Sequence, residues 1–272
     1  TYLHGYSLEQ AHDTRSAGKS FATLLAGIAV GHGADFTAAT PVLSLFPEYG
    51  KLEHLDDDKR AITVGDLMSM SSGLACDDGD ADSPGGEDRM QMQQDERDWY
   101  RYTLNLPMTQ APGADTAVYC SAGINLLGGV VRNATGRRLT DLFEQWIAGP
   151  MQMRGYHINL MPDGDAYLGG GIRLRPRDML KLGQLYLDGG VWKGRRLVDQ
   201  RWIEASVARH TTFGPNHDYG YGWHLHSFHV DGDGDDGGRD FRGYAAEGNG
   251  GQFVIVVPEL ELVVAITGGN YG

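Results

Sequence analysis

The hydrophobic pattern changes its period along this chain, and that change restricts the fold more than any other feature. Residues 16 to about 165 carry apolar side chains at helical spacing, with long loops between them. Farther on, "YGYGWHLHSFHV", "FRGYAAEG" and "GQFVIVVPELELVVAITGG" are rich in aromatic and β-branched residues, which predicts three or four antiparallel strands. A helical block followed by a sheet block predicts an α+β protein: an antiparallel sheet flanked by helices, plus a mostly helical lobe.

Local signals place several of the helices. In "AITVGDLMSMSSGL", Thr63 is a good N-cap for a short helix that ends near Gly73. "INLLGGVVRNATG" predicts a helix closed by Gly136, and "LTDLFEQWIAGPM" predicts one opened by Thr140. A further helix in "RPRDMLKLGQLYLDGG" has Asp178 near its start.

The composition and net charge limit the kinds of molecule that the chain is expected to bind. The chain has 272 residues, 41% of them hydrophobic, so it is long enough to bury a large core in one broad domain or two smaller ones. Its net charge of −13 argues against nucleic acid and anionic membranes, because both select for Lys and Arg. The longest apolar candidate, residues 21–30, is about half of a membrane span. The sequence does not indicate an oligomeric state.

The segment "RSAGKSFATLLAGIAV" permits two readings. Gly18-Lys19-Ser20 is the end of a phosphate-binding loop, but that motif needs a glycine five positions earlier, where this chain has Asp13. The same segment is an S-x-x-K motif at the start of an amphipathic helix, which makes Ser16 and Lys19 neighbours on its first turn. A lysine beside a serine activates the hydroxyl as a nucleophile. Taken alone, the motif also fits an N-cap serine and a surface lysine.

Two further motifs give the S-x-x-K segment a context. Tyr119-Cys120-Ser121 has the form Y-x-[SN] directly before a helix, and "AAEGNGGQFVIVVPELELVV" is a glycine-rich turn followed by strand, proline and strand. With "TVGDLMSMSSGL", these three motifs occur in the order that resembles the serine β-lactamase and DD-peptidase superfamily. The chain resembles in particular its class C-like branch, which includes family VIII esterases and 6-aminohexanoate-dimer hydrolases. The resemblance covers nearly the whole chain.

This resemblance implies a role for each motif residue. Ser16 attacks a carbonyl and becomes acylated, while Lys19 and Tyr119 share its proton, with Tyr119 as the general base that the Lys19 ammonium supports. The backbone N–H groups of Ser16 and Asn249 form the oxyanion hole. Substrate-binding positions are Ser121, Gly248 and Gly250.

The third motif departs from the family pattern. Counting back from Pro258, the place usually held by the Lys or His of K-T-G or H-T-G falls on Ala246. A cation there would bind a substrate carboxylate, so its loss favours small neutral esters or amides over penicillins or peptidoglycan peptides. The predicted function is therefore an esterase-like serine hydrolase. The alternatives are a β-lactamase or D-amino-acid peptidase, and a non-catalytic binding or sensor module that keeps the fold.

A second departure is length, because only fifteen residues precede Ser16. Relative to the family, we expect a chain truncated at both termini, without the N-terminal strands and C-terminal helix. The resemblance implies a sheet lobe from residues 1–15 and 166–272, and a mostly helical lobe from residues 16–165 that carries the S-x-x-K and Y-x-S motifs.

Cys76 and Cys120 are the only cysteines, and both lie beside segments that the family brings to its active-site cleft. A disulfide between them is one possibility and would favour export to an oxidising compartment such as the periplasm. Two reduced, buried cysteines are the other. Localisation is otherwise undetermined.

The sequence predicts neither a metal nor a cofactor. "DGDGDDGG", residues 231–238, superficially has the composition of a calcium loop, but Asp236 stands where the loop needs Gly and Arg242 where it needs Glu. His224, His226 and His229 alternate on an expected strand without a specified further ligand, so exposed hairpin residues are favoured over zinc. There is no G-x-S-x-G motif, which argues against an α/β-hydrolase.

Overall fold

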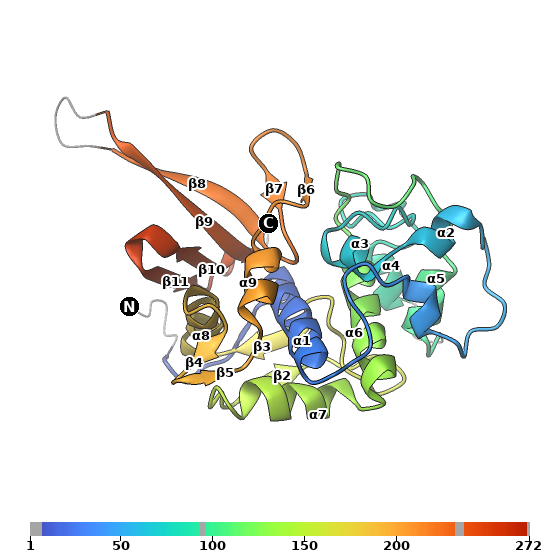
Figure 1. Cartoon of the computed structure of the whole chain (residues 1–272), viewed down its shortest axis with the longest axis horizontal. Helices are drawn as coiled ribbons and strands as arrows, with labels where there is room; N and C mark the ends of the chain where they lie inside the picture. The colour runs from blue at the N-terminus through green and yellow to red at the C-terminus, as the bar shows by residue number, and fades with distance from the viewer. Residues whose placement is uncertain (1–6, 93–95, 232–236, 271–272) are drawn as a thin grey trace.

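An antiparallel sheet with the strand order β11-β10-β9-β8-β7-β6 forms one side of the protein in the computed structural model (Figure 1). The structure describes residues 7–92, 96–231 and 237–270. The long strands of the sheet are those that the β-branched and aromatic segments predicted: β8 (His224–Val230), β9 (Arg239–Gly248), β10 (Gln252–Val257) and β11 (Leu262–Ile266). Two short strands extend it, β6 (Thr211–Thr212) and β7 (Asp218–Tyr219). Strand β7 pairs with β8, and β6 pairs with β7, so pairing and not composition defines these two strands; this is why the sequence predicted a smaller sheet.

One face of the sheet is covered by helix α8 (Pro176–Leu187), which packs on β10 and β11 (Figure 1). Its interior Gly183 lets the helix approach closely, because a Cβ there would lie 2.5 Å from a methyl carbon of Val263 and 2.9 Å from one of Val254. Helix α9 (Gln200–Ser206) and the hairpin of β4 (Val191–Trp192) and β5 (Arg195–Arg196) follow α8 in the chain.

A second, three-stranded sheet anchors the N-terminal segment. Strand β1 (His12–Asp13) pairs with β3 (Ile172–Leu174), which also pairs with β2 (His157–Ile158). Thr14 continues this attachment, since its backbone N–H and its hydroxyl both donate to the Ile172 carbonyl. The S-x-x-K turn that comes next is therefore held at its start by residues about 160 positions away.

Helices make up the other side of the protein around α6 (Ser121–Thr135), against which α1 (Lys19–Gly31) packs. Lys19 to Ala29 of α1 are all buried. The remaining helices of the described chain are α2 (Asp57–Ala61), α3 (Val64–Met68), α4 (Glu87–Met92), α5 (Trp99–Leu104), α7 (Leu139–Phe143), a π-helical turn (Glu144–Ala148) and the short 3₁₀ turns η1 (Arg15–Gly18), η2 (Val42–Leu45) and η4 (Pro258–Leu260).

The ends of the helices can be compared with the capping residues that the sequence predicted. Thr63 caps α3 and forms a capping box with Asp66, and Gly136 closes α6 with a φ of 64°, both as predicted. The prediction that Thr140 opens the next helix was wrong, because α7 begins at Leu139. The Leu139 N–H donates to the carboxylate of Asp165, 26 positions later, so no local cap was available to read.

The α+β fold class is confirmed. The division into lobes at residues 1–15 with 166–272 and 16–165 stays a prediction. Among the described helices, none has the length and apolar character needed to cross a membrane. The segment compared above with a calcium loop falls largely on residues 232–236, which lie outside the described residues.

Candidate active site

Ser16 lies in η1, the 3₁₀ turn that runs directly into α1. The Lys19 ammonium donates a hydrogen bond of 2.8 Å to the Ser16 hydroxyl, and the Lys19 side chain is only 1% exposed. Neither Gly18 nor Ser20 faces an open loop: a Cβ on Gly18 would lie 3.0 Å from the Thr14 hydroxyl, and the Ser20 hydroxyl donates to the Gly222 carbonyl. The glycine and second serine of this segment therefore serve packing, and Ser16, with the buried Lys19 behind it, is the residue that reaches the cavity.

Gly170 and Gly248, which come from distant segments, pack against the turn that carries Ser16. Arg15, the residue before it, has a positive φ of 49°, a conformation that a non-glycine residue adopts at a cost. A Cβ on Gly170 would lie 3.0 Å from the Arg15 carbonyl oxygen, and one on Gly248 would lie 2.3 Å from the Thr14 carbonyl oxygen. Backbone thus touches backbone on both sides, which fixes the position of the Ser16 N–H.

Tyr119 comes to the same place from the segment before α6. Its ring centroid lies 5.0 Å from the Lys19 ammonium nitrogen. From the sheet side, Phe213 and His224 pack on the ring, at centroid distances of 5.7 and 6.3 Å. Ser16, Lys19 and Tyr119, which are up to 103 positions apart in the sequence, thus form one cluster.

The glycine-rich turn between β9 and β10 forms the edge of the site. Asn249 lines the same cavity as Ser16 and Tyr119. Gly248 ends β9 in backbone contact with η1, and Gly250 follows with a positive φ of 84° that suits glycine in a tight turn. Gly250 is buried, and its carbonyl accepts a hydrogen bond from the backbone of Asn270.

The assignment of the third-motif cation position to Ala246 stays a prediction. Ala246 is 1% exposed and lies in the core opposite Val254. The next residue, Glu247, lies on the other face of β9, where its carboxylate accepts a hydrogen bond of 2.5 Å from His226. Burial raises the pKa of the Glu247 carboxyl, but the hydrogen bond from His226 and the attraction of the neighbouring histidines together outweigh burial and lower it. Neither Ala246 nor Glu247 supplies a cation.

The cavity in front of Ser16 has a volume of about 400 Å³. Its charged lining is mostly acidic and comes largely from residues 78–89: Asp13, Arg15, Asp78, Asp80, Glu87, Asp88 and Arg89. The field in the cavity is therefore negative. Such a site repels anionic ligands and accepts neutral or cationic ones.

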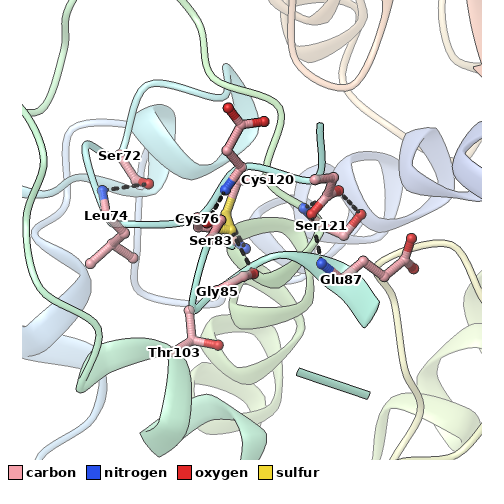
Figure 2. Close-up of a disulfide and its surroundings, with 12 residues drawn as sticks. Ser72, Leu74, Cys76, Ser83, Gly85, Glu87, Thr103, Cys120 and Ser121 are labelled. Atoms are coloured by element: carbon pink, nitrogen blue, oxygen red, sulfur yellow. Dashed lines mark hydrogen bonds between the residues drawn. A yellow bond between two sulfur atoms is a disulfide. The ribbon is translucent and has the colours of Figure 1, made fainter. Parts of the chain in front are cut away.

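Cys76 and Cys120 form a disulfide beside this cavity (Figure 2). The bridge ties the loop before α4 to the residue directly after Tyr119. Cys120 is also the N-cap of α6, and its sulfur accepts a hydrogen bond from the Gly123 backbone. The bridge therefore fixes the backbone that presents the tyrosine.

Asp78 is the residue of this site that the sequence analysis missed. Its carboxylate lines the cavity and accepts hydrogen bonds from the backbone and hydroxyl of Ser121 and from the backbone of Glu87. Ser121 itself is fully buried, so a substrate meets Asp78 rather than the Ser121 hydroxyl. Only the acidic run "CDDGD" after Cys76 hinted at a functional residue, and a solvated turn explains such a run equally well.

The histidines of β8 are engaged with different partners. His224 Nδ1 shares a hydrogen bond with His217, His226 binds Glu247 and His229 binds Asp240. Burial lowers the pKa of His224 to about 4, so its imidazole is neutral at physiological pH. Within residues 7–92, 96–231 and 237–270, no group of three or more His, Cys, Asp or Glu side chains is arranged to hold a metal ion.

Comparisons with known proteins agree on one family. The model of the Beta-lactamase family matches residues 5–268. A 6-aminohexanoate-dimer hydrolase of Paenarthrobacter ureafaciens is 32% identical over 91 residues, a segment that amounts to 33% of this chain and 23% of that enzyme.

Among solved structures, a protein of Bacillus anthracis assigned as a 6-aminohexanoate-dimer hydrolase superposes with a TM-score of 0.80 at 17% identity, over 100% of this chain and 70% of that one. A D-stereospecific amidohydrolase of a Streptomyces species gives a TM-score of 0.69 at 16% identity over 94% of this chain and 81% of that one. A family VIII carboxylesterase gives 0.68 at 16% identity over 96% and 78%. At these identities the structures share the fold.

Proposed function

Because this chain belongs to the β-lactamase family, we propose that it is a serine hydrolase that acts through an acyl-enzyme on small neutral esters or amides. The observation that carries the proposal is the 2.8 Å hydrogen bond from the buried Lys19 ammonium to the Ser16 hydroxyl, at the edge of a cavity that Tyr119 also lines. A lysine that only needed solvation would lie at the surface.

In the proposed reaction, the Ser16 oxygen attacks the carbonyl carbon of the substrate while its proton passes to Tyr119. The positive charge of Lys19, 5.0 Å from the Tyr119 ring, stabilises the phenolate that accepts this proton. The oxyanion accepts hydrogen bonds from the backbone N–H groups of Ser16 and Asn249. Tyr119 then protonates the leaving alcohol or amine, and water hydrolyses the acyl-enzyme to release the acid.

The charges around the cavity support neutral substrates. A penicillin or cephalosporin brings a carboxylate, which would meet an acidic cavity wall. A β-lactamase with this lining would work against repulsion. Esters and amides without a negative charge avoid that cost. The solved structures that share the fold include both a carboxylesterase and an amidohydrolase, so both bond types belong in the test.

The test is hydrolysis of p-nitrophenyl butyrate, its anilide analogue and a chromogenic cephalosporin by the wild-type chain and by Ser16→Ala. We expect ester turnover that falls roughly a thousandfold or more in the variant. The matched control is Ser227→Ala, an exposed serine of β8, which should keep the wild-type rate. A folded wild-type chain that turns over none of the three, or a Ser16→Ala variant that keeps full activity, would overturn the proposal and favour a binding module.

A further inference from the structure

Asp78 is hydrogen-bonded to residues on both sides of Cys120 and to the start of α4. Its backbone N–H donates to the Tyr119 carbonyl at 2.9 Å. One carboxylate oxygen accepts from the Ser121 backbone at 3.0 Å and from the Ser121 hydroxyl, and the other accepts from the Glu87 backbone at 2.9 Å. Asp78 therefore holds the residues on either side of Cys120 and ties them to the start of α4.

The same carboxylate supplies the negative charge that faces Lys19. Burial raises the pKa of Asp78, and the attraction of the Lys19 ammonium opposes that effect. The other titratable groups that act on this carboxyl are Glu87 at the start of α4 and the buried Tyr167, whose hydroxyl donates to Glu87. Among these groups, Lys19 is the only cation. A carboxylate at this place balances the positive charge of the lysine on which the phenolate of Tyr119 depends.

We propose that Asp78 is the positioning residue of this active site: it fixes the Tyr119–Ser121 backbone against the Ser16–Lys19 pair and balances the charge of Lys19. This rests on the proposed function, since Asp78 acts through Tyr119 and Lys19 and takes no proton from the substrate. The disulfide between Cys76 and Cys120 holds the two backbones together, and Asp78 sets their alignment beside the cavity.

The test is Asp78→Asn in the whole chain, with p-nitrophenyl butyrate as the substrate. The amide keeps the shape of the side chain but loses the charge, and one of its polar atoms becomes a donor that faces donors. We expect kcat to fall roughly 10- to 100-fold with KM within about 2-fold, because the misalignment concerns the reacting groups and not substrate binding. A fall in kcat at a nearly unchanged KM separates this positioning role from a loss of substrate binding.

The matched control is Asp77→Asn, next in sequence, whose carboxylate accepts a bond from the Gly79 backbone within its own turn. This control should keep the wild-type kcat and KM. Asp78→Asn with wild-type kcat, or with a KM that rises as much as kcat falls, would overturn the proposal. If Asp78→Asn does not fold, Ser121→Ala decides: it removes one donor to the carboxylate, and a wild-type kcat in that variant would also overturn the proposal.

Failure here is separable from failure of the proposed function. A Ser16→Ala variant that keeps its activity rejects the serine mechanism whatever Asp78 does. Activity that depends on Ser16 but not on Asp78 rejects only the positioning role.

Discussion

Substitution of Gly248 by alanine tests how the sheet positions the nucleophile. A Cβ at this position would lie 2.3 Å from the Thr14 carbonyl oxygen, 3.1 Å from the Ala17 nitrogen and 3.1 Å from the Arg15 Cβ. An ordinary contact between a carbon and an oxygen needs roughly 1 Å more than the first of these distances. All three neighbours are backbone or close to it, so the strand and the Ser16 turn must separate.

The size of the effect follows from that separation. A shift of about 1 Å between catalytic groups costs roughly 100-fold in rate, and we expect kcat/KM of Gly248→Ala for p-nitrophenyl butyrate to fall by that factor. Overpacking of this kind costs about 1–3 kcal/mol of unfolding free energy, which lowers Tm by roughly 2–10 °C in a chain of this size. Initial rates and thermal unfolding followed by circular dichroism measure the two losses.

A matched control is Gly31→Ala at the end of α1, where a new Cβ meets nothing within 4 Å and φ is not positive. This variant should keep the wild-type activity and a Tm at or slightly above that of the wild type. If Gly248→Ala also kept the wild-type rate and Tm, the close approach of β9 to the turn would not control the position of Ser16, and the reasoning would be wrong.

The remaining predictions concern the disulfide, a buried imidazole and the charge of the cavity. The Cys76→Ser/Cys120→Ser double variant should lose about 4 kcal/mol of unfolding free energy by the chain-entropy estimate for a bridge across 44 positions, measured by urea denaturation; a loss below about 1 kcal/mol would contradict that estimate. His224 has a pKa of about 4 in the folded chain, below the ordinary 6.5, so as the pH falls the unfolded chain takes up this proton before the folded chain does. The contribution of His224 to the unfolding free energy is therefore complete above pH 6.5 and is lost as the pH falls toward 4, by up to about 3 kcal/mol. His224→Gln should flatten the unfolding free energy across that window, and an unchanged slope would exclude this source. Finally, kcat/KM for mono-p-nitrophenyl glutarate should be at least about 10-fold below that for p-nitrophenyl butyrate at low salt, with a gap that narrows as salt rises; equal rates would refute a negative cavity.

Much of the fold was accessible from the sequence because its signals are local. Apolar spacing, the capping box at Thr63 and the glycine that closes α6 each lie within one helix, and the structure confirms them. The family was accessible for a related reason: three motifs in a fixed order are specific even where each one alone is common, and the family match over residues 5–268 agrees.

Errors arose where a residue depends on a partner far along the chain. The start of α7 was predicted one residue late because its cap is the carboxylate of Asp165. Asp78 was missed for the same reason, because its partner Ser121 lies 43 positions farther along the chain.

The sequence by itself determined the chemistry that this chain carries: a serine and a lysine three positions apart on one helical turn, and a tyrosine before a second helix. Covalent spacing and helical geometry are sufficient for the first pair. Only the tertiary structure decided what surrounds them. Three features depend on contacts between segments more than 40 positions apart: the contact of β9 with the Ser16 turn, the disulfide beside Tyr119, and the Asp78 carboxylate that attracts Lys19. Such contacts form when burial of the shared core brings the segments together.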